Sequence, residues 1–247
     1  MKALVTGMNG TVAPVLARAL RASGAEVAAW DRGADPPDSP EAVAATIQRE
    51  APDWVCHLAT GPEAWAGWIA EACTPSGARM LFTSSVSVFA PREAGPIPPE
   101  AAPNATDDYG QYKARAEALV RAAAPQAVIA RLGWQIGAAP GSNTMTDWMH
   151  REGTAHGVVR ASARWHPACS WLEDTADALV RLMASGARGT YHLDGCGDLT
   201  FYDLARGLRA HLGGDWRVER TNEPAMDLRM ADPRVAVRPV ADRLPAV

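Results

Sequence analysis

A short apolar strand, a glycine-containing turn and a helix follow one another at the N-terminus, and this order restricts the possible fold most. The pattern predicts a strand over residues 2–5, a turn over 6–13 and a helix over 11–23. Gly7 permits a tight turn, and Gly10 lets the backbone approach a pyrophosphate bound by the free N–H groups of the helix. The stretch indicates a dinucleotide site, with an ordinary glycine-containing turn as the alternative. The residues assigned to the cofactor here are Gly7, Asn9, Gly10, Thr11 and Val12.

The second predicted strand, over residues 26–30, ends at an acidic residue. Asp31 lies 21 positions after Gly10, where a carboxylate can hold the ribose hydroxyls of NAD. This carboxylate would repel the 2′-phosphate of NADP, whereas the guanidinium of Arg32 could accept that phosphate. We therefore assign Asp31 and Arg32 to the cofactor and expect NAD, with NADP left open. The alternative is that both residues simply begin a solvated loop.

Further apolar strands alternate with helical segments along the chain. Strands are predicted over residues 53–59, 79–83 and 128–132. This alternation indicates an α/β fold with a Rossmann-type, doubly wound parallel sheet. Ligands gather at the carboxyl ends of the strands in such a sheet. The residues assigned to the cofactor at the end of the strand over 53–59 are Leu58, Ala59 and Thr60.

One face of a predicted helix carries a phenol beside an ammonium. Tyr109 precedes Lys113 by four positions, so both side chains share one face of that helix. A nearby cation lowers the pKa of a tyrosine toward the range that proton transfer at neutral pH requires. Serine hydroxyls over residues 84–87 follow a strand at the same edge of the sheet, where one could bind a substrate oxygen. The alternatives are an incidental Tyr and Lys on a surface helix, and serines that bond their own backbone.

Composition excludes several classes of function. The chain has 247 residues and a formal net charge of −4, which gives no reason to expect nucleic acid or an anionic membrane as partner. No apolar run is long enough to span a membrane, and the chain begins directly with a predicted strand rather than a signal peptide. The four cysteines form no Cys-x-x-Cys pair. These features predict a reduced, cytoplasmic protein without a metal site.

Several motifs occur in the order found in one large enzyme family. They are Thr6-Gly7-x-x-Gly10-x-x-Ala13, His57-Leu58-Ala59-Thr60, Ser84-Ser85-Val86-Ser87-Val88-Phe89-Ala90, Tyr109-x-x-x-Lys113, Arg131-Leu132-Gly133-Trp134-Gln135-Ile136-Gly137, Ser170-Trp171-Leu172-Glu173-Asp174-Thr175-Ala176 and Gly189-Thr190-Tyr191-His192-Leu193. In this order they resemble the extended short-chain dehydrogenases/reductases, which include nucleotide-sugar epimerases, dehydratases and ketoreductases. The resemblance covers residues 1–215. It implies that Tyr109 and Lys113 are the catalytic pair, with Lys113 also binding the nicotinamide ribose of the cofactor. It further implies that Ser85 is the catalytic hydroxyl and binds the substrate oxygen.

Two departures from the family pattern limit the types of reaction that fit this sequence. The segment after Ser85 lacks the Thr-Asp-Glu that the resemblance would require of a sugar 4,6-dehydratase. The stretch over residues 131–137 is similar to the family's Arg-Pro-Gly-Asn-Val-Tyr-Gly, but Trp134 replaces the Asn. Reductases of the dTDP-4-dehydrorhamnose type often carry Trp there, so we assign Trp134 to the substrate.

The C-terminal part is expected to bind the substrate. Residues 1–137 are predicted to form the NAD(P)-binding domain with the catalytic residues. Residues 138–247 are predicted to form mainly a small substrate-binding portion, with residues 170–195 returning to the core sheet. An irregular stretch is expected over residues 137–157. Three further residues suit a diphosphate and a stacked base, with a solvated basic loop as the alternative; they are Arg160, Arg164 and Trp165.

The sequence therefore predicts an NAD(P)-dependent oxidoreductase or epimerase of the extended short-chain type. Hydride transfer is expected at a carbonyl or carbinol carbon of a small-molecule substrate, namely a nucleotide-activated sugar or a related metabolite. The sequence does not distinguish a reductase from an epimerase, and it does not decide whether the protein is a homodimer. The rival from another class is a dinucleotide-binding sensor or interaction protein without turnover.

Overall fold

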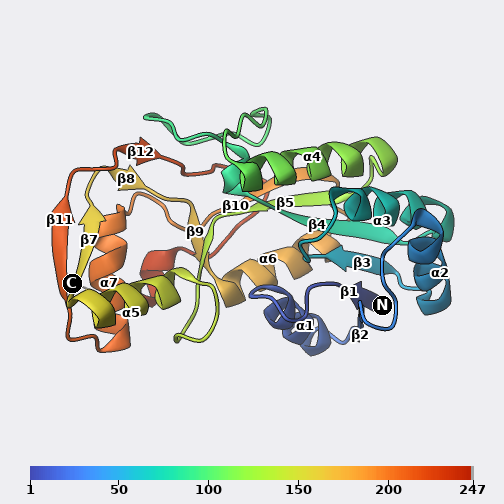
Figure 1. The fold of residues 1–247 in the computed structure, drawn as a ribbon, viewed down its shortest axis with the longest axis horizontal. Coiled ribbons are helices and arrows are strands. Elements are labelled where there is room, and N and C mark those ends of the chain that lie inside the picture. The colour runs from blue at the N-terminus through green and yellow to red at the C-terminus, as the bar shows by residue number, and fades with distance from the viewer. Residues whose placement is uncertain (246–247) are drawn as a thin grey trace.

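The computed structural model describes residues 1–245 as two lobes joined side by side (Figure 1). No helix among these residues is long and apolar enough to cross a membrane. The elements of the first half are β1 (Lys2–Val5), α1 (Ala13–Ala22), β2 (Glu26–Ala29), α2 (Pro40–Glu50), β3 (Trp54–His57), α3 (Glu63–Ser76), β4 (Arg79–Ser85), a 3-10 turn η1 (Val86–Val88), α4 (Asp108–Ala123) and β5 (Val128–Leu132). Those of the second half are β6 (Trp134–Ile136), α5 (Met145–His156), β7 (Val158–Ser162), β8 (Trp165–His166), β9 (Cys169–Trp171), α6 (Leu172–Ala184), β10 (Gly189–Leu193), α7 (Phe201–Leu212), β11 (Arg217–Thr221), β12 (Met226–Asp227) and a 3-10 turn η2 (Val240–Arg243).

The larger lobe is built on a six-stranded parallel sheet. Its strand order is β10-β5-β4-β3-β1-β2, and each neighbouring pair runs parallel. The chain moves outward from β1 to β2 and then crosses to β3 on the other side of β1. The order therefore reverses between β1 and β3, which is where ligands bind in doubly wound sheets. The predicted Rossmann-type fold is confirmed.

Helices cover both faces of this sheet. Helices α2, α3 and α4 pack on one face around the buried side chains of Trp65, Ile69 and Phe82. Helices α1 and α6 pack together on the other face, where Leu16 and Leu179 are fully buried. Figure 1 shows α4 and α3 on the upper side of β4 and β5, and α6 on the lower side of these two strands, next to α1. Helices therefore cover both faces of the sheet, and a ligand can approach the strands only at their carboxyl ends.

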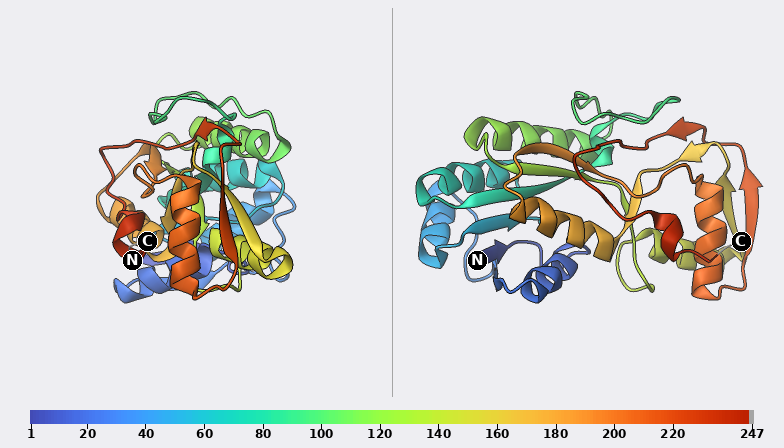
Figure 2. Two further views of the ribbon diagram at one scale, coloured as in Figure 1. Left: turned by 90° about the vertical axis from the view of Figure 1, so that its left-hand side faces the viewer. Right: turned by 180° about the vertical axis from the view of Figure 1, so that it is seen from behind.

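The smaller lobe lies beyond these carboxyl ends (Figure 2). It contains α5 and α7 with the parallel strand pairs β7–β11, β8–β12 and β6–β9. Its core buries Phe201, Leu204, Trp171 and Trp216. After β9 the chain leaves this lobe, so that α6 lies against α1 and β10 joins the edge of the main sheet.

Helix α5 corrects the expectation of an irregular stretch over residues 137–157. The Thr144 hydroxyl accepts a hydrogen bond from the Asp147 N–H at 3.2 Å, and the Asp147 carboxylate accepts one from the Thr144 N–H at 2.9 Å. This reciprocal capping box stabilises the first turn of the helix. The Thr-x-x-Asp pattern was present in the sequence, so the helix could have been found from its cap.

Candidate active site

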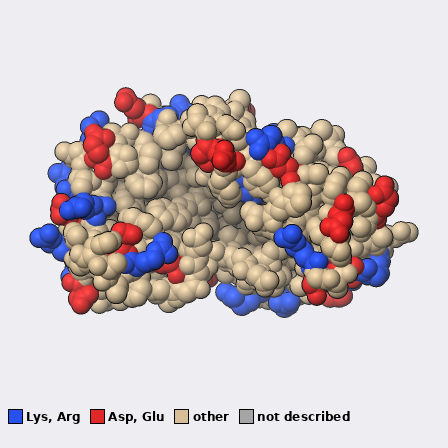
Figure 3. Space-filling model, viewed as in Figure 1, with Lys and Arg blue, Asp and Glu red and all other residues tan. Residues whose placement is uncertain are grey.

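A cavity of about 850 Å³ opens at the carboxyl ends of β1, β3 and β4. In Figure 3 the molecule is hollowed near its middle, between the sheet and the smaller lobe, and most of the surface in the hollow is uncharged. The volume falls within the range typical of cofactor and ligand sites. Its lining comprises Gly7, Met8, Asn9, Gly10, Thr11, Val12, Ala13, Ala29, Trp30, Asp31, Arg32, Gly33, Leu58, Ala59, Thr60, Thr83, Ser84, Ser85, Tyr109, Lys113, Leu132, Gly133 and Gln135. All residues assigned to the cofactor from the sequence are therefore brought to one cavity.

The glycine turn passes very close to the end of β3. Gly7 has a φ of +81°, and a Cβ atom there would lie 2.9 Å from the Ala59 nitrogen. Both the backbone conformation and the lack of space require glycine. Next to it, the buried Thr6 hydroxyl accepts hydrogen bonds from the N–H groups of Leu58 at 3.0 Å and Ala59 at 3.1 Å. Thr6 and Gly7 thus hold the ends of β1 and β3 together as one wall of the cavity.

This wall fits the phosphates of a dinucleotide. Helix α1 begins at Ala13 directly after the turn, and no side chain caps its N-terminus. Its first N–H groups and its partial positive charge are therefore available to an anion. Asp31 and Arg32 lie at the end of β2, with one Asp31 oxygen accepting the Gly33 N–H at 2.8 Å. The Arg32 guanidinium lies 5.3 Å from the centre of the Trp65 ring. A carboxylate and a cation are thus both present where the adenosine ribose would lie.

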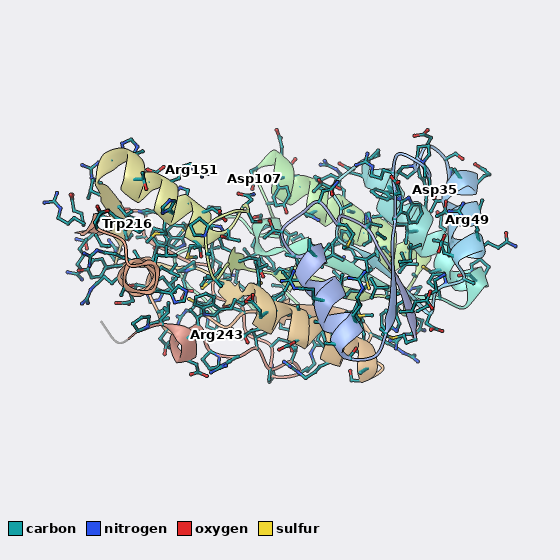
Figure 4. The ribbon with its side chains drawn as sticks, turned by 90° about the horizontal axis from the view of Figure 1, so that it is seen from below. Asp35, Arg49, Asp107, Arg151, Trp216 and Arg243 are labelled. Carbon is teal, nitrogen blue, oxygen red and sulfur yellow. The ribbon has the colours of Figure 1, made fainter. Side chains whose placement is uncertain are left out.

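The side chains of Ser85 and Tyr109 come together because α4 begins against the turn after β4. Gly110 makes this contact possible, since a Cβ atom there would clash with the Ser87 carbonyl oxygen. The Asp107 carboxylate caps α4 by accepting the Gly110 N–H at 2.9 Å. Figure 4 shows this end of α4, at Asp107, nearer the smaller lobe, whereas Asp35 and Arg49 lie at the far end of the sheet. The start of α4 therefore faces the cavity.

Two hydroxyls at this end of the cavity are hydrogen-bonded. The Ser85 hydroxyl accepts the Ser87 N–H at 3.1 Å and lies 3.1 Å from the Ser87 hydroxyl. Tyr109 is 47% exposed as a residue, yet desolvation raises the pKa of its phenol, and a hydrogen bond with Ser85 partly opposes that rise. The pKa of the phenol is thus raised rather than lowered, which corrects the expectation that a neighbouring cation lowers it. The phenol is protonated at neutral pH and can donate a proton.

Lys113 lies one helical turn further along α4 and is buried. Its ammonium donates a hydrogen bond to the Thr83 carbonyl oxygen at 3.0 Å and lies 5.1 Å from the centre of the Phe82 ring. Burial lowers the pKa of Lys113 to about 8, although the charge of Glu117 opposes the shift. An ammonium has three N–H donors, so Lys113 can donate to a ligand and keep its hydrogen bond to the Thr83 carbonyl oxygen.

Four residues assigned to the substrate do not line this cavity. Arg160 is exposed and pairs with Glu219 at 3.5 Å, while Arg164 is exposed and pairs with Glu223 at 3.8 Å. Trp134 and Trp165 stack with 6.3 Å between their ring centres inside the aromatic cluster of the smaller lobe. The structure therefore does not bring the two arginines to Tyr109, and their assignment remains a prediction from the sequence.

The cavity also includes residues that sequence reasoning missed. Gln135 in β6 and Thr83 in β4 are buried and belong to its lining. Thr83 directly precedes Ser84, and Gln135 directly follows Trp134. Both residues therefore adjoin motifs that were assigned to the site, and this adjacency could have identified them. The proline-rich stretch over residues 91–103 does not line this cavity. Its Ile97 donates a backbone hydrogen bond to the Arg229 carbonyl oxygen at 2.7 Å and accepts one from the Ala231 N–H at 3.0 Å.

Solved structures with the same fold include bacterial reductases, epimerases and a dehydratase. A dTDP-4-dehydrorhamnose reductase from Bacillus anthracis superimposes with a TM-score of 0.81 and 19% identity, covering 94% of this chain and 90% of that one. The enzyme of the same name from Clostridium acetobutylicum gives a TM-score of 0.79 and 22% identity, covering 90% of this chain and 84% of that one. These likenesses independently confirm the fold.

Curated relatives are also reductases, but the chain matches only part of each. A 2′-dehydrokanamycin reductase from Streptomyces kanamyceticus is 29% identical over 236 residues, covering 86% of this chain and 61% of that protein. The dTDP-4-dehydrorhamnose reductase of Mycobacterium tuberculosis is 30% identical over 164 residues, covering 64% of this chain and 52% of that protein. The chain therefore spans about half to three fifths of the length of these relatives.

One family model matches most of the chain. The model of the RmlD substrate binding domain aligns with residues 61–244. This range runs from the end of β3 through the candidate catalytic residues and the smaller lobe, almost to the last described residue. It agrees with the resemblance to extended short-chain dehydrogenases/reductases that the motifs indicated. An alignment of this extent shows that the chain belongs to the RmlD substrate binding domain family.

Proposed function

We propose that this protein is an NAD(P)-dependent ketoreductase that reduces a carbonyl group on a sugar or sugar-like ring. The observation that carries this proposal is that Ser85, Tyr109 and Lys113 line the same cavity as the glycine turn. A cofactor extending from the turn would reach them without leaving the cavity. The names of the relatives support reductase chemistry, and two structural neighbours are in complex with NADP and NAD⁺, respectively.

Each of the three residues has a separate role in the reduction of the carbonyl group. Bound reduced nicotinamide would supply the hydride to the carbonyl carbon. Tyr109 donates its proton to the carbonyl oxygen, so that the product is an alcohol. Ser85 holds that oxygen by a hydrogen bond while negative charge develops on it. Lys113, held on the Thr83 carbonyl oxygen one helical turn after Tyr109, holds the cofactor ribose with its remaining N–H donors.

Reductase chemistry is favoured over epimerase chemistry by the curated relatives, which are named as reductases. Their names cover both a nucleotide-activated keto-sugar and an oxidised aminoglycoside. We therefore propose a ketone on a sugar-like ring as the substrate and leave the nucleotide open. A cytoplasmic location and a homodimer remain predictions from the sequence.

Turnover of candidate ketones tests the proposal. The full chain is mixed with NADH or NADPH and either dTDP-4-dehydrorhamnose or 2′-dehydrokanamycin, and loss of the reduced-nicotinamide absorbance is followed. We expect one ketone to be reduced, and Tyr109→Phe to lower kcat by roughly 100- to 10,000-fold with little change in cofactor affinity. Cofactor binding without reduction of any ketone in a wider panel would favour the dinucleotide-binding sensor instead.

A further inference from the structure

Gln135 is a buried amide in the wall of the cavity. It lies in β6, is 7% exposed, and belongs to the cavity lining together with Leu132 and Gly133. Its amide nitrogen donates hydrogen bonds to the Gly133 carbonyl oxygen at 3.0 Å and to the Ser170 hydroxyl at 3.4 Å. These two acceptors account for both N–H groups of the amide. They therefore determine which end of the amide is nitrogen and which is oxygen.

The oxygen of the same amide has no partner. Among the described residues, nothing donates a hydrogen bond to Gln135 Oε1, although this atom is buried. An unsatisfied buried acceptor destabilises a protein, and such groups in native structures call for an explanation. A ligand that donates to this oxygen would compensate for its burial.

We propose that Gln135 is a specificity-determining residue whose Oε1 accepts a hydrogen bond from a bound molecule in the cavity. This inference rests on the proposed function. The ligand group is an O–H or N–H donor, and two molecules could carry it: the substrate ring, through a hydroxyl or amino group, and the cofactor, through its carboxamide. Gln135 belongs to the cavity lining, so its side chain borders the space that a bound molecule would occupy.

Replacement of the amide by a thioether of similar length tests this proposal. Gln135→Met removes the acceptor and keeps most of the side-chain volume. Two quantities are measured on the full chain: the Kd of NADH by fluorescence titration, and the KM and kcat of whichever ketone the wild type reduces. We expect the affinity for one of the two molecules to fall by about five- to tenfold, the effect of one lost hydrogen bond. A higher KM with unchanged Kd identifies the substrate as donor, and a higher Kd identifies the cofactor.

A matched control separates ligand binding from damage to the fold. Ser170→Ala removes one partner of the Gln135 nitrogen but leaves Oε1 in place, so we expect its Kd and KM to stay within about twofold of wild type while its stability falls modestly. If Gln135→Met does not fold, Gln135→Asn keeps an amide but withdraws the oxygen by one methylene, and the same loss of affinity is expected. Unchanged Kd and KM in a folded Gln135 variant would overturn the proposal while leaving the ketoreductase assignment intact.

Discussion

The hydroxyls of Thr11 and Ser142 lie 2.8 Å apart although 131 residues separate them in the chain. Thr11 belongs to the turn that precedes α1, and Ser142 belongs to the loop that leads into α5. The Asp147 carboxylate holds this loop in place, because it accepts hydrogen bonds from the N–H groups of Gly141 and Ser142. The capping box of α5 thus also positions the hydroxyl that bonds Thr11. A residue of the smaller lobe thereby contacts the proposed phosphate site.

We expect Ser142→Ala to weaken cofactor binding. If Ser142 donates to Thr11, the hydrogen of the Thr11 hydroxyl is directed to the bound phosphate, and loss of Ser142 leaves that hydroxyl free to rotate. One exposed hydrogen bond is worth up to about 1.4 kcal/mol, so the Kd of NADH should rise by up to about tenfold, with kcat unchanged. The control is Asn143→Ala in the same exposed loop. Equal Kd values for Ser142→Ala and wild type would show that this contact does not position Thr11.

The pH dependence of activity should report the buried ammonium of Lys113. Burial lowers the pKa of Lys113 to about 8, so this side chain is charged below that pH and neutral above it. Activity that needs the ammonium is therefore present at neutral pH and declines as the pH rises through about 8. The pKa of Tyr109 is raised above its usual range, so the phenol stays protonated there and does not cause the decline. The measurement is kcat/KM for the cofactor, which reports groups of the free enzyme.

Lys113→Arg provides the control for this assignment. A guanidinium stays charged throughout the accessible pH range, so the decline near pH 8 should disappear even if the overall rate is lower. An unchanged decline in a folded and active Lys113→Arg enzyme would assign it to another group.

Cofactor preference should depend on the end of β2. The Asp31 carboxylate would accept hydrogen bonds from the ribose hydroxyls of NADH and repel the 2′-phosphate of NADPH. We therefore expect NADH to bind more tightly, and Asp31→Asn to reduce that preference by about tenfold, equivalent to one charge-assisted hydrogen bond. Titration of both reduced cofactors measures this. A tenfold or greater preference of the wild type for NADPH would mean that Arg32 determines the choice, and Arg32→Ala should then abolish it.

Local sequence signals predicted the large lobe well because its elements depend on short-range chemistry. The glycine turn and the alternation of strands with helices define β1, α1 and the sheet before any long-range contact is considered. The four-residue spacing of Tyr109 and Lys113 on one helix face is also a local feature. The approach of Tyr109 to Ser85, in contrast, depends on the contact of Gly110 with Ser87, which joins two separate elements.

The smaller lobe was harder to predict because its contacts join distant segments. Strand β7 pairs with β11, and β8 pairs with β12, although each pair is separated by more than fifty residues. Arg160 was assigned to an anion because it lies near Arg164 and Trp165 in the sequence, but Glu219 on the paired strand lies beside it. The partner of a surface charge depends on strand pairing, which a single sequence does not reveal.

Acid should destabilise the fold partly through His57. This histidine is buried at the end of β3, where its Nδ1 lies 2.9 Å from the Thr6 hydroxyl and its ring packs against Trp65 and Phe82. Burial, assisted by the charge of Lys113, lowers its pKa from 6.5 to about 3. Between these values the unfolded chain binds a proton that the folded chain does not, so stability falls as the pH drops below 6.5. His192, whose pKa burial lowers to about 4, acts in the same direction.

The expected slope for His57 is about 1.4 kcal/mol per pH unit, which removes about 2 kcal/mol of stability between neutral pH and pH 5. Asp194 contributes the opposite slope, because burial raises the pKa of its carboxyl group to about 6. The informative quantity is therefore the difference between wild type and His57→Gln, from urea unfolding at a series of pH values. The variant is less stable at neutral pH because ring packing is lost, but its stability should fall less steeply toward pH 5. Parallel curves for the two proteins would show that His57 is protonated in the folded state as readily as in the unfolded chain.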